Sequence, residues 1–301
     1  MIPDGIILLD KQKGITSMAS DNFIKRLAGT RKVGHSGTLD PFATGLLPVF
    51  TGKALKVMRY TDDYDKAYDC TCVFGMSTST MDPEGEVTAT KTLTGSEEEF
   101  AAIREAFAEL KKITSQVPPV FSAKKIDGKK AYDLARQGVE VKMPAHPVRI
   151  YSLDINDMRY EDGRIYADIS IACSKGTYIR SICDDAGKIT GFHAHALTLR
   201  RTKAGPFDVK DAYTEEQLAE LKAKEDYSFV LPREKALATM RKVTLNDSQF
   251  ADIKLGKKIS SEGFGDLEDG VRVAAFHGEE LAAVLYRDND IMRIERMLAV
   301  E

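Results

Sequence analysis

Residues 32–48 read KVGHSGTLDPFATGLLP, and this segment bears most strongly on the fold and chemistry of the protein. Glycine and proline recur throughout residues 30–53, which excludes one long helix and predicts a loop. Asp40 precedes Pro41, so its backbone is pushed toward an extended conformation and its carboxylate projects from a constrained turn. Such a carboxylate could act as a nucleophile or a general base, although an Asp-Pro pair can also simply open a turn.

A second cluster, CSKGTYIRSICDD at residues 173–185, joins a predicted strand to a predicted helix. Gly176 is expected to form the turn, and Arg180 then falls early in the helix. Lys175 and Arg180 could bind a phosphate or a carboxylate. The alternative is an ordinary helix start with an arginine on the surface.

A third cluster, Asp65-Lys66-Ala67-Tyr68, begins another predicted strand. Because side chains alternate along a strand, Lys66 and Tyr68 are expected to share one face. Tyr68 could stack on a nucleobase, as aromatic residues commonly do in RNA sites, or it could be a half-buried residue of the core.

The rest of the chain predicts an α+β fold with an at least partly antiparallel sheet. Alternating patterns predict strands at residues 5–10, 67–75, 148–154 and 164–173, the last two pairing across residues 161–163. Apolar periodicity and capping signals predict helices at residues 17–28, 96–112, 129–137, 178–189 and 214–224, with Ser17 as the first cap. Beyond Pro232, short strands at residues 271–276 and 281–286 indicate a small β-rich unit.

Length and composition exclude several classes of protein. The chain has 301 residues, of which 43% are hydrophobic and 30% charged, so it is not disordered, collagen-like or of low complexity. No apolar run approaches the roughly 18 residues of a membrane helix, and the start lacks the pattern of a signal peptide, so the cytoplasm is the default location. Four cysteines without C-x-x-C spacing argue against a disulfide framework and a zinc site, and predict four core thiols: Cys70, Cys72, Cys173 and Cys183.

Charge is distributed unevenly along the chain. The net charge of −3 gives no general attraction to nucleic acid. Residues 121–150, however, contain seven basic and three acidic side chains, and residues 11–35 are also basic, whereas residues 82–109 and 208–226 are acidic. One face could therefore meet a polyanion while another faces water, or both faces could simply be solvated.

Six motifs in sequence order resemble the TruB family of tRNA pseudouridine synthases. The catalytic motif of that family is similar to residues 33–48. The other matches are LLDKQKGITS at 8–17, DKAY at 65–68, VPPVFSAKK at 117–125 with GKKAY at 128–132, CSKGTYIR at 173–180 and LTLRR at 197–201. The chain departs from the family pattern at Gln12, Ser36 and Phe42, where the family usually has Pro, Thr and Leu, and it matches weakly at its C-terminal end.

The resemblance implies a pseudouridine synthase catalytic domain over residues 1–232, with a mixed, largely antiparallel sheet flanked by helices. It also implies a basic insertion that grips RNA, at about residues 122–147, and a small PUA-like domain over residues 233–301. The implied activity is isomerisation of a specific uridine to pseudouridine in tRNA, at position 55 of the T-loop, after the base has been flipped out. The reaction changes no redox state and adds no atom, so neither a cofactor nor a metal is expected. We further expect a cytoplasmic monomer that binds the T-arm of tRNA and no membrane.

The resemblance also implies roles for single residues of the motifs. Asp40 would start the reaction, by attacking C1′ or C6 or by removing a ribose proton. Arg180 would pair with Asp40 and hold it ionised, which lowers the pKa of the carboxyl. Tyr68 would stack on the uracil and is a candidate base for the C5 proton.

Further residues would hold the RNA. The nucleoside pocket would be formed by Tyr178, Leu199, Lys11, Lys66 and His35, of which His35 could replace the flipped base in its stack. The RNA backbone would be bound by basic residues of the insertion and its flank: Lys124, Lys125, Lys129, Lys130, Arg136 and Arg149.

Two other interpretations of these residues stay open. The first is a noncatalytic RNA-binding or tRNA-folding module that uses the basic segment alone. The second is a small-molecule α/β enzyme in which the basic segment is incidental. Activity that depends on Asp40 would exclude the first, and binding of tRNA at low salt would exclude the second.

Overall fold

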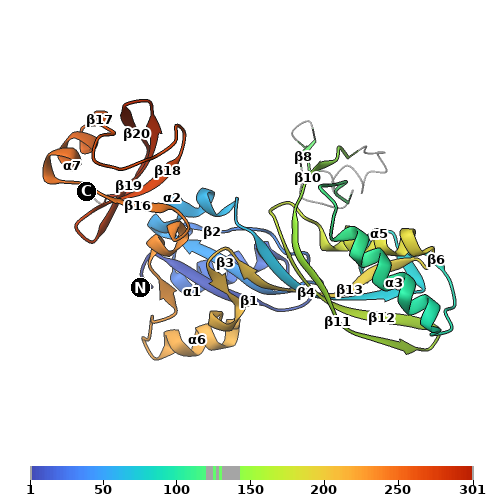
Figure 1. Ribbon diagram of the computed structural model, residues 1–301. Coiled ribbons are helices and arrows are strands. Elements are labelled where there is room, and N and C mark those ends of the chain that lie inside the picture. Colours follow the sequence, from blue (N-terminus) through green and yellow to red (C-terminus); the bar gives the residue numbers. More distant parts are fainter. Residues whose placement is uncertain (1, 120–124, 127–128, 131–142, 300–301) are drawn as a thin grey trace.

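The computed structural model describes residues 2–119, 125–126, 129–130 and 143–299. Its main body is a sheet in the order β11–β12–β4–β13–β3–β1–β15, with β14 beside β13 and β2 beside β3 (Figure 1). These strands are β1 (Ile6–Lys11), β2 (Val33–His35), β3 (Thr44–Thr51), β4 (Lys66–Phe74), β11 (Ile150–Glu161), β12 (Arg164–Cys173), β13 (Ala194–Ala204), β14 (Phe207–Asp208) and β15 (Val230–Leu231). Every pairing in this sheet is antiparallel except that of β13 with β3, which confirms the predicted mixed, largely antiparallel sheet.

Helices pack against one face of this sheet. α5 (Ile179–Thr190) lies on β4 and β13, α3 (Glu97–Leu110) lies beside α5, and α1 (Ser17–Ala28) lies against β2 and β3 (Figure 1). Ile24, Phe107, Ile182 and Phe74 are buried together between these helices and the strands. The other helical segments within the described residues are α2 (Leu55–Met58), α6 (Glu215–Ala223), α7 (Asp247–Lys254) and the 3₁₀ turns η1 (Gly52–Ala54), η2 (Arg59–Thr61), η3 (Val209–Asp211) and η4 (Arg233–Leu237).

Local signals determine where α1 and α5 begin and end. The cap of α1 is Thr16 rather than the predicted Ser17, because Thr16 has the extended backbone of a cap and its hydroxyl accepts from the Ala19 N–H. Both helices end at glycines in the left-handed conformation, Gly29 and Gly191, close to the predicted ends at residues 28 and 189.

The loop predicted for residues 30–53 is wrong in part, because β2 and β3 lie within it. β3 is a central, buried strand. The burial of its apolar side chains outweighs the local preference of Gly45 and Pro48 for turns and loops. Gly45 is required there: its φ is +98°, and a Cβ would lie 2.4 Å from the carbonyl oxygen of Arg201 on β13. The carbonyl of Pro48 accepts from the Ser36 N–H at 3.0 Å.

In the part of the chain that the structure describes, three small two-stranded sheets lie outside the main sheet. They are β5 (Met76–Thr78) with β6 (Val87–Thr90), β7 (Ser115–Gln116) with β10 (His146–Pro147), and β8 (Lys125–Ile126) with β9 (Lys129–Lys130). The helix predicted for residues 129–137 is therefore wrong at its start, where β9 pairs with β8, and its remaining residues lie outside the described ones.

The cysteines correct a further expectation. Cys72 of β4 and Cys183 of α5 form a disulfide, and only Cys70 and Cys173 are free thiols, both buried. The Sγ atom of Cys70 lies 3.6 Å from that of Cys183. The bonded pair is separated by 111 residues, so no local spacing could predict it; the packing of α5 on β4 brings the two Cα atoms to 5.7 Å.

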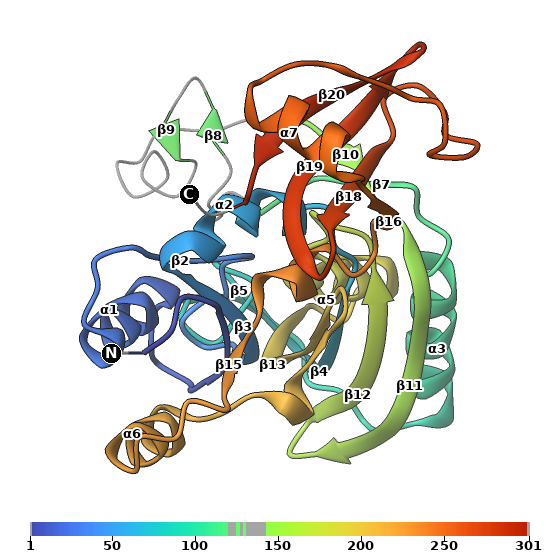
Figure 2. The ribbon, with the colours of Figure 1, turned by 90° about the vertical axis from the view of Figure 1, so that its left-hand side faces the viewer.

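The C-terminal part is β-rich, as predicted. Its sheet has the order β16–β18–β19–β20–β17, at one end of the molecule (Figures 1 and 2). The strands are β16 (Arg241–Thr244), β17 (Ile259–Ser260), β18 (Arg272–His277), β19 (Glu280–Asp288) and β20 (Ile291–Met297). One face of this sheet buries a core of its own around Leu285, while Val284 and Ala274 share a second core with Tyr60 and Tyr64 of the main body.

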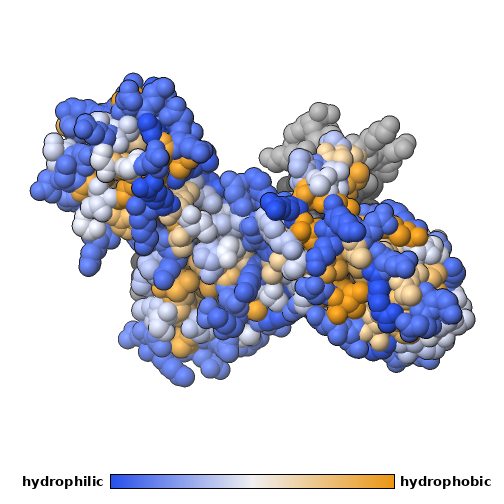
Figure 3. All heavy atoms as spheres, in the orientation of Figure 1, coloured by the Kyte–Doolittle hydropathy of each residue, from blue (hydrophilic) through white to orange (hydrophobic). Residues whose placement is uncertain are grey.

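The surface shows no extended apolar region on the face drawn in Figure 3. Hydrophilic residues cover most of that face, and apolar residues gather in small patches, one of them between α3 and β11. Among the described residues, no helix has both the length and the apolar character needed to cross a membrane.

Candidate active site

A pocket of about 300 Å³ opens where the residue 37–40 loop, the start of β4 and the start of α5 meet. Its walls contain Asp40, Tyr68, Tyr178, Arg180 and Leu199, which the sequence places far apart. Lys66 and Arg201 complete the side adjoining the sheet. The pocket therefore brings together most of the residues to which the sequence assigns a catalytic or nucleoside-binding role.

Asp40 and Arg180 form an ion pair at this pocket. The Nε atom of Arg180 lies 3.0 Å from Oδ2 of Asp40. The arginine side chain is only 4% exposed, whereas that of Asp40 is 37% exposed. The helix start of α5 thus holds a buried cation behind a carboxylate that remains accessible from the pocket.

A second carboxylate, Asp82, binds the same guanidinium. The Nη1 atom of Arg180 lies 3.0 Å from Oδ2 of Asp82 and donates to the Thr80 carbonyl at 2.9 Å. Asp82 is itself buried, and it accepts from the Glu84 N–H at 3.0 Å. The expectation that the acidic segment from residue 82 faces water is therefore wrong at its first residue. A signal was available, because Asp82 precedes Pro83 just as Asp40 precedes Pro41.

The pKa of Asp40 is shifted upward, against the expectation of a lowered value. Burial is the largest cause and raises the pKa above 3.8; Arg180 opposes it, and the negative charge of Asp82 raises the pKa again. The expectation assumed an arginine that serves Asp40 alone. Because Arg180 divides its charge between two carboxylates, it cannot offset the burial of Asp40.

Tyr68 reaches the pocket from β4 and contacts a buried arginine of β13. Its hydroxyl is hydrogen-bonded with Arg201, and burial raises the pKa of that hydroxyl, so Tyr68 stays a neutral phenol at neutral pH. Arg201 is 1% exposed and donates to the carbonyls of Leu46 at 2.7 Å and Gly37 at 2.8 Å. The sequence matched Arg201 within a motif without assigning it a role; here it ties Tyr68 to the loop that presents Asp40.

The other predicted pocket residues differ in where they lie. Tyr178 and Leu199 line the pocket, as does Lys66, whose Nζ donates to the Tyr64 carbonyl and whose pKa burial lowers to about 8. Lys11 does not line it. Its buried Nζ donates to the backbone carbonyl of Ile15 at 2.7 Å, and also to those of Gln12 and Pro41, so it supports the loop next to Asp40 from behind.

His35 is also absent from the pocket wall. Its Nδ1 lies 2.9 Å from Oδ2 of Asp21, and its Nε2 lies 3.2 Å from the Thr38 hydroxyl. Both ring nitrogens therefore have partners within the protein, which is the arrangement of a structural loop histidine.

The predicted RNA-backbone residues are only partly described. Lys125, Lys129 and Lys130 belong to β8 and β9, while Lys124 and Arg136 lie outside the described residues. The guanidinium of Arg149 lies over the Tyr151 ring, 5.5 Å from its centroid.

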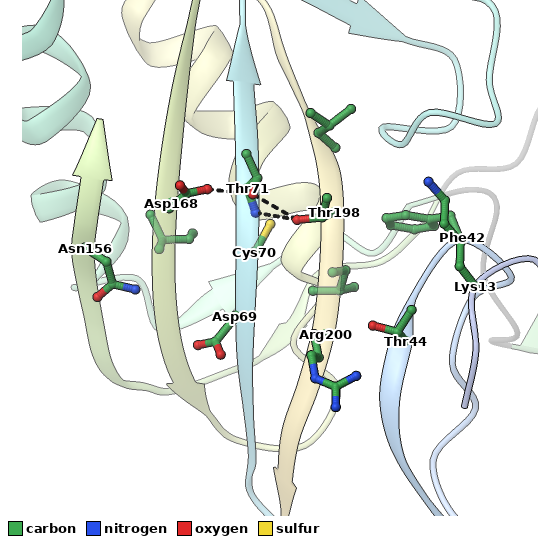
Figure 4. A pocket seen from close by; sticks show the side chains of 13 residues that line it. Lys13, Phe42, Thr44, Asp69, Cys70, Thr71, Asn156, Asp168, Thr198 and Arg200 are labelled. Carbon is green, nitrogen blue, oxygen red and sulfur yellow. Dashed lines mark hydrogen bonds between the residues drawn. The ribbon is translucent and has the colours of Figure 1, made fainter. Parts of the chain in front are cut away.

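A second pocket, of about 500 Å³, lies on the opposite face of the sheet (Figure 4). It is lined by Asp69, Thr71, Thr198 and Arg200, which alternate along their strands with Tyr68, Leu199 and Arg201 of the first pocket, and also by Asp168, Cys70 and Leu199. The hydroxyl of Thr71 donates to Asp168 at 2.6 Å and accepts from Thr198 at 2.9 Å, so these polar groups satisfy one another. Leu199 borders both pockets and separates them.

In the part of the chain that the structure describes, one group of side chains has the spacing of metal ligands: the sulfurs of Cys70, Cys72 and Cys183, within 4.8 Å of one another. Two of them are joined in the disulfide, which leaves a single thiol. This group lies in the buried core rather than in the pocket wall.

Comparison with known proteins gives a consistent result. A model of the TruB family pseudouridylate synthase N-terminal domain matches residues 25–179, and one of the tRNA pseudouridylate synthase B C-terminal domain matches residues 180–238. The tRNA pseudouridine synthase B of Streptococcus gordonii is 39% identical over 289 residues, which cover 95% of this chain and 97% of that protein. The protein of the same name from Listeria monocytogenes is 36% identical and covers 93% and 92%.

Two solved structures share the fold. A structure of an H/ACA ribonucleoprotein bound to a substrate RNA containing 2′-deoxyuridine has a chain that is 21% identical, with a TM-score of 0.71 over 98% of this chain and 85% of that one. A Cbf5-Nop10-Gar1 complex gives 24% identity, a TM-score of 0.71 and the same coverage. At these identities the likeness concerns the fold alone.

Proposed function

The chain belongs to the TruB family of pseudouridylate synthases, and on that premise we propose that it converts uridine 55 in the T-loop of tRNA to pseudouridine, with Asp40 starting the reaction. The protein is an isomerase, and the name shared by its relatives supports tRNA as its substrate. The single observation that most supports the site assignment is the Asp40–Arg180 ion pair in the wall of a pocket that also contains Tyr68.

The reaction needs little beyond a positioned carboxylate. The bond between uracil N1 and ribose C1′ breaks, the base turns, and C5 joins C1′; a proton leaves C5 and one is gained at N1, so atoms and electrons balance. Asp40 would begin this sequence by attacking C1′ or C6 or by removing a ribose proton. Arg180 would keep the carboxylate directed into the pocket throughout, which is the positioning that catalysis requires.

Tyr68 would act mainly through its ring. Its neutral hydroxyl is held by Arg201, so the ring keeps one orientation in the pocket, where a flipped uracil could stack on it. Because Tyr68 is a neutral phenol, its oxygen could accept the C5 proton only while the hydroxyl proton moves to another group, for example a water. Tyr178 and Leu199 would form the walls beside the base, and a pocket of about 300 Å³ suits one nucleoside rather than a paired stem.

Binding of the remaining tRNA would depend on charge. We assign the backbone contacts to the basic residues of the insertion at about residues 122–147 and to Arg149, within a catalytic domain of residues 1–232 followed by a PUA-like domain of residues 233–301. Phosphate contacts of this kind release counterions, so affinity should fall steeply with salt.

The pH dependence of the reaction should reflect the raised pKa of Asp40. Only the carboxylate form can attack or take a proton, so kcat/KM should rise with pH through that pKa, at a pH above the ordinary value of 3.8. In Asp82→Asn, a like charge is removed and Arg180 serves Asp40 alone, so the acid limb should move to lower pH. Profiles of kcat/KM on tRNA for the two proteins test this; an unmoved or upward-moved limb in Asp82→Asn would contradict the electrostatic account.

The function itself is tested with a tRNA transcript that contains 5-tritiated uridine. We expect release of one equivalent of tritium per tRNA, pseudouridine at position 55, and no release from a transcript with cytidine at that position. Release from the cytidine transcript would show that another uridine is the target. Failure to release tritium would reject the proposal. If tRNA is still shifted at low salt, that failure would favour the noncatalytic RNA-binding module, and if tRNA is not shifted it would favour a small-molecule enzyme.

A further inference from the structure

One wall of the catalytic pocket is held in place by side chains that do not line it. Gly176, Thr177 and Tyr178 form this wall, immediately before the α5 residue Arg180. Two side chains from β7 and β10 bind its backbone: Gln116 and His146. Neither was singled out by the sequence.

Gln116 binds both peptide groups of Tyr178. Its Oε1 accepts from the Tyr178 N–H at 2.8 Å, and its Nε2 donates to the Tyr178 carbonyl at 3.1 Å. Gln116 is only 4% exposed, so these bonds are sheltered from water. Tyr178 is the N-cap of α5, and its own side chain makes no capping hydrogen bond, so Gln116 supplies the contact that orients the helix start.

His146 binds the same wall two residues earlier. Its Nε2 lies 2.6 Å from the Gly176 carbonyl oxygen, which can only accept, so Nε2 carries the proton. The imidazole also meets the Tyr178 ring edge to face, with centroids 6.3 Å apart. Gly176 has a φ of +78°, and a Cβ at that position would lie 2.8 Å from Nε2, so the close approach requires glycine.

These two residues form one structural unit. Gln116 and His146 are direct partners across the β7–β10 ladder. The other end of the wall is anchored nearby, where the Ser174 N–H donates to the Arg149 carbonyl at 2.8 Å and the Ser174 hydroxyl accepts from the Arg149 N–H at 2.8 Å. The wall from Ser174 to Tyr178 is thus bonded to Gln116, shortly before the basic segment of residues 121–150, and to His146 and Arg149 at the end of that segment.

We propose that Gln116 and His146 are positioning residues for the isomerisation, and that they act by setting Tyr178 and, through the start of α5, the guanidinium of Arg180 against Asp40. The inference rests on the proposed function. Because neither side chain lines the pocket, their loss should change the rate of the chemical step rather than the binding of tRNA. A misplacement of about 1 Å at a reacting group can cost as much as about 100-fold in rate.

The test compares variants that remove these contacts with variants that keep them. Gln116→Met keeps the volume and removes both hydrogen bonds, whereas Gln116→Glu keeps the acceptor for the Tyr178 N–H. His146→Leu removes the donor to Gly176, and His146→Gln keeps one. Single-turnover tritium release at saturating tRNA gives the rate, filter binding gives the Kd, and thermal melting reports the fold.

We expect Gln116→Met to be slower by about 10- to 100-fold with its Kd within about threefold of wild type. Gln116→Glu should also be slower, because its second carboxylate oxygen would face the Tyr178 carbonyl instead of donating to it. His146→Gln should recover most of the rate that His146→Leu loses. Asn156→Leu is the matched control. The Asn156 amide lies on the opposite face of the sheet and donates to the Ser170 hydroxyl at 2.8 Å, so the variant that lacks this amide should keep the full rate.

A folded Gln116→Met at the wild-type rate would overturn the proposal, as would a rate loss no greater than that of Asn156→Leu. If Gln116→Met does not fold, the two His146 variants test the proposal instead. Equal rates in His146→Leu and His146→Gln would overturn it, and a higher rate in His146→Gln would support it. Wild-type protein that releases no tritium would reject both this inference and the proposed function, whereas full activity in all four variants would reject this inference alone.

Discussion

Asp40→Asn should bind tRNA as the wild type does, with a Kd within about threefold, and yet release tritium at least about 10³-fold more slowly. The amide nearly matches the carboxylate in shape, so the pocket should stay intact. The amide, however, cannot attack carbon as an anion or accept a proton. The raised pKa of Asp40 does not affect this expectation, because the variant has no ionisable group at this position. The measurements are single-turnover tritium release and filter binding on the same transcript.

The matched control for this variant is Asp69→Asn. Asp69 lies one residue beyond Tyr68 on β4 and faces the opposite side of the sheet (Figure 4). Its carboxylate accepts from the Ser170 hydroxyl at 2.8 Å. It should keep the full rate. Unchanged turnover in Asp40→Asn would instead favour a different catalytic group, and a wild type that binds tRNA without turnover would favour the noncatalytic tRNA-folding module.

Arg180→Met should lose both activity and stability, because it leaves two carboxylates beside each other without their shared cation. Asp82 is the more buried of the two, and Arg180 is its partner at 3.0 Å. Removing one member of a buried ion pair typically costs about 3–5 kcal/mol, since the remaining charge stays desolvated. We expect a loss of that size in the free energy of unfolding from urea titration, with a rate at least about 10²-fold lower.

The double variant Arg180→Met with Asp82→Asn separates the two effects. It removes the stranded charge of Asp82, so much of the lost stability should return, while the rate should stay low because Asp40 still lacks the group that orients it. Recovery of activity together with stability would show that Arg180 matters only for the fold. Equal stability of the single and double variants would show that the stability lost in Arg180→Met does not come from leaving Asp82 without its partner.

The site depends on how one sheet is ordered. Tyr68 of β4 and Arg201 of β13 are register partners in neighbouring strands, and Arg201 reaches the carbonyl of Gly37 at the start of the Asp40 loop. α5 packs on the same two strands and presents Arg180 from its first turn. The loop, the tyrosine and the arginine therefore meet at one place because β3, β13 and β4 lie side by side.

Features that depend on near neighbours in the chain could be predicted from the sequence. The hairpin of β11 and β12, the strand that presents Tyr68 and the glycine ends of α1 and α5 follow from alternation, turns and caps, which act over one to four residues. The constrained Asp40 and its family motif are equally local. Local rules misled where burial outweighed them, as in β3, whose glycine and proline predict a loop but whose apolar side chains belong to the core.

Contacts between groups that are distant in the chain could not be predicted in this way, because they form only when the whole chain has folded. Asp82 and Arg180 are separated by 98 residues, Gln116 and Tyr178 by 62, and Cys72 and Cys183 by 111. The direction of the Asp40 pKa shift follows from such neighbours, because burial and through-space charge depend on distance in the folded molecule and not on distance along the chain. A sequence motif can therefore identify the reacting carboxylate, while the packing of the sheet determines its ion-pair partner, the direction of its pKa shift and the pocket wall that lies beside it.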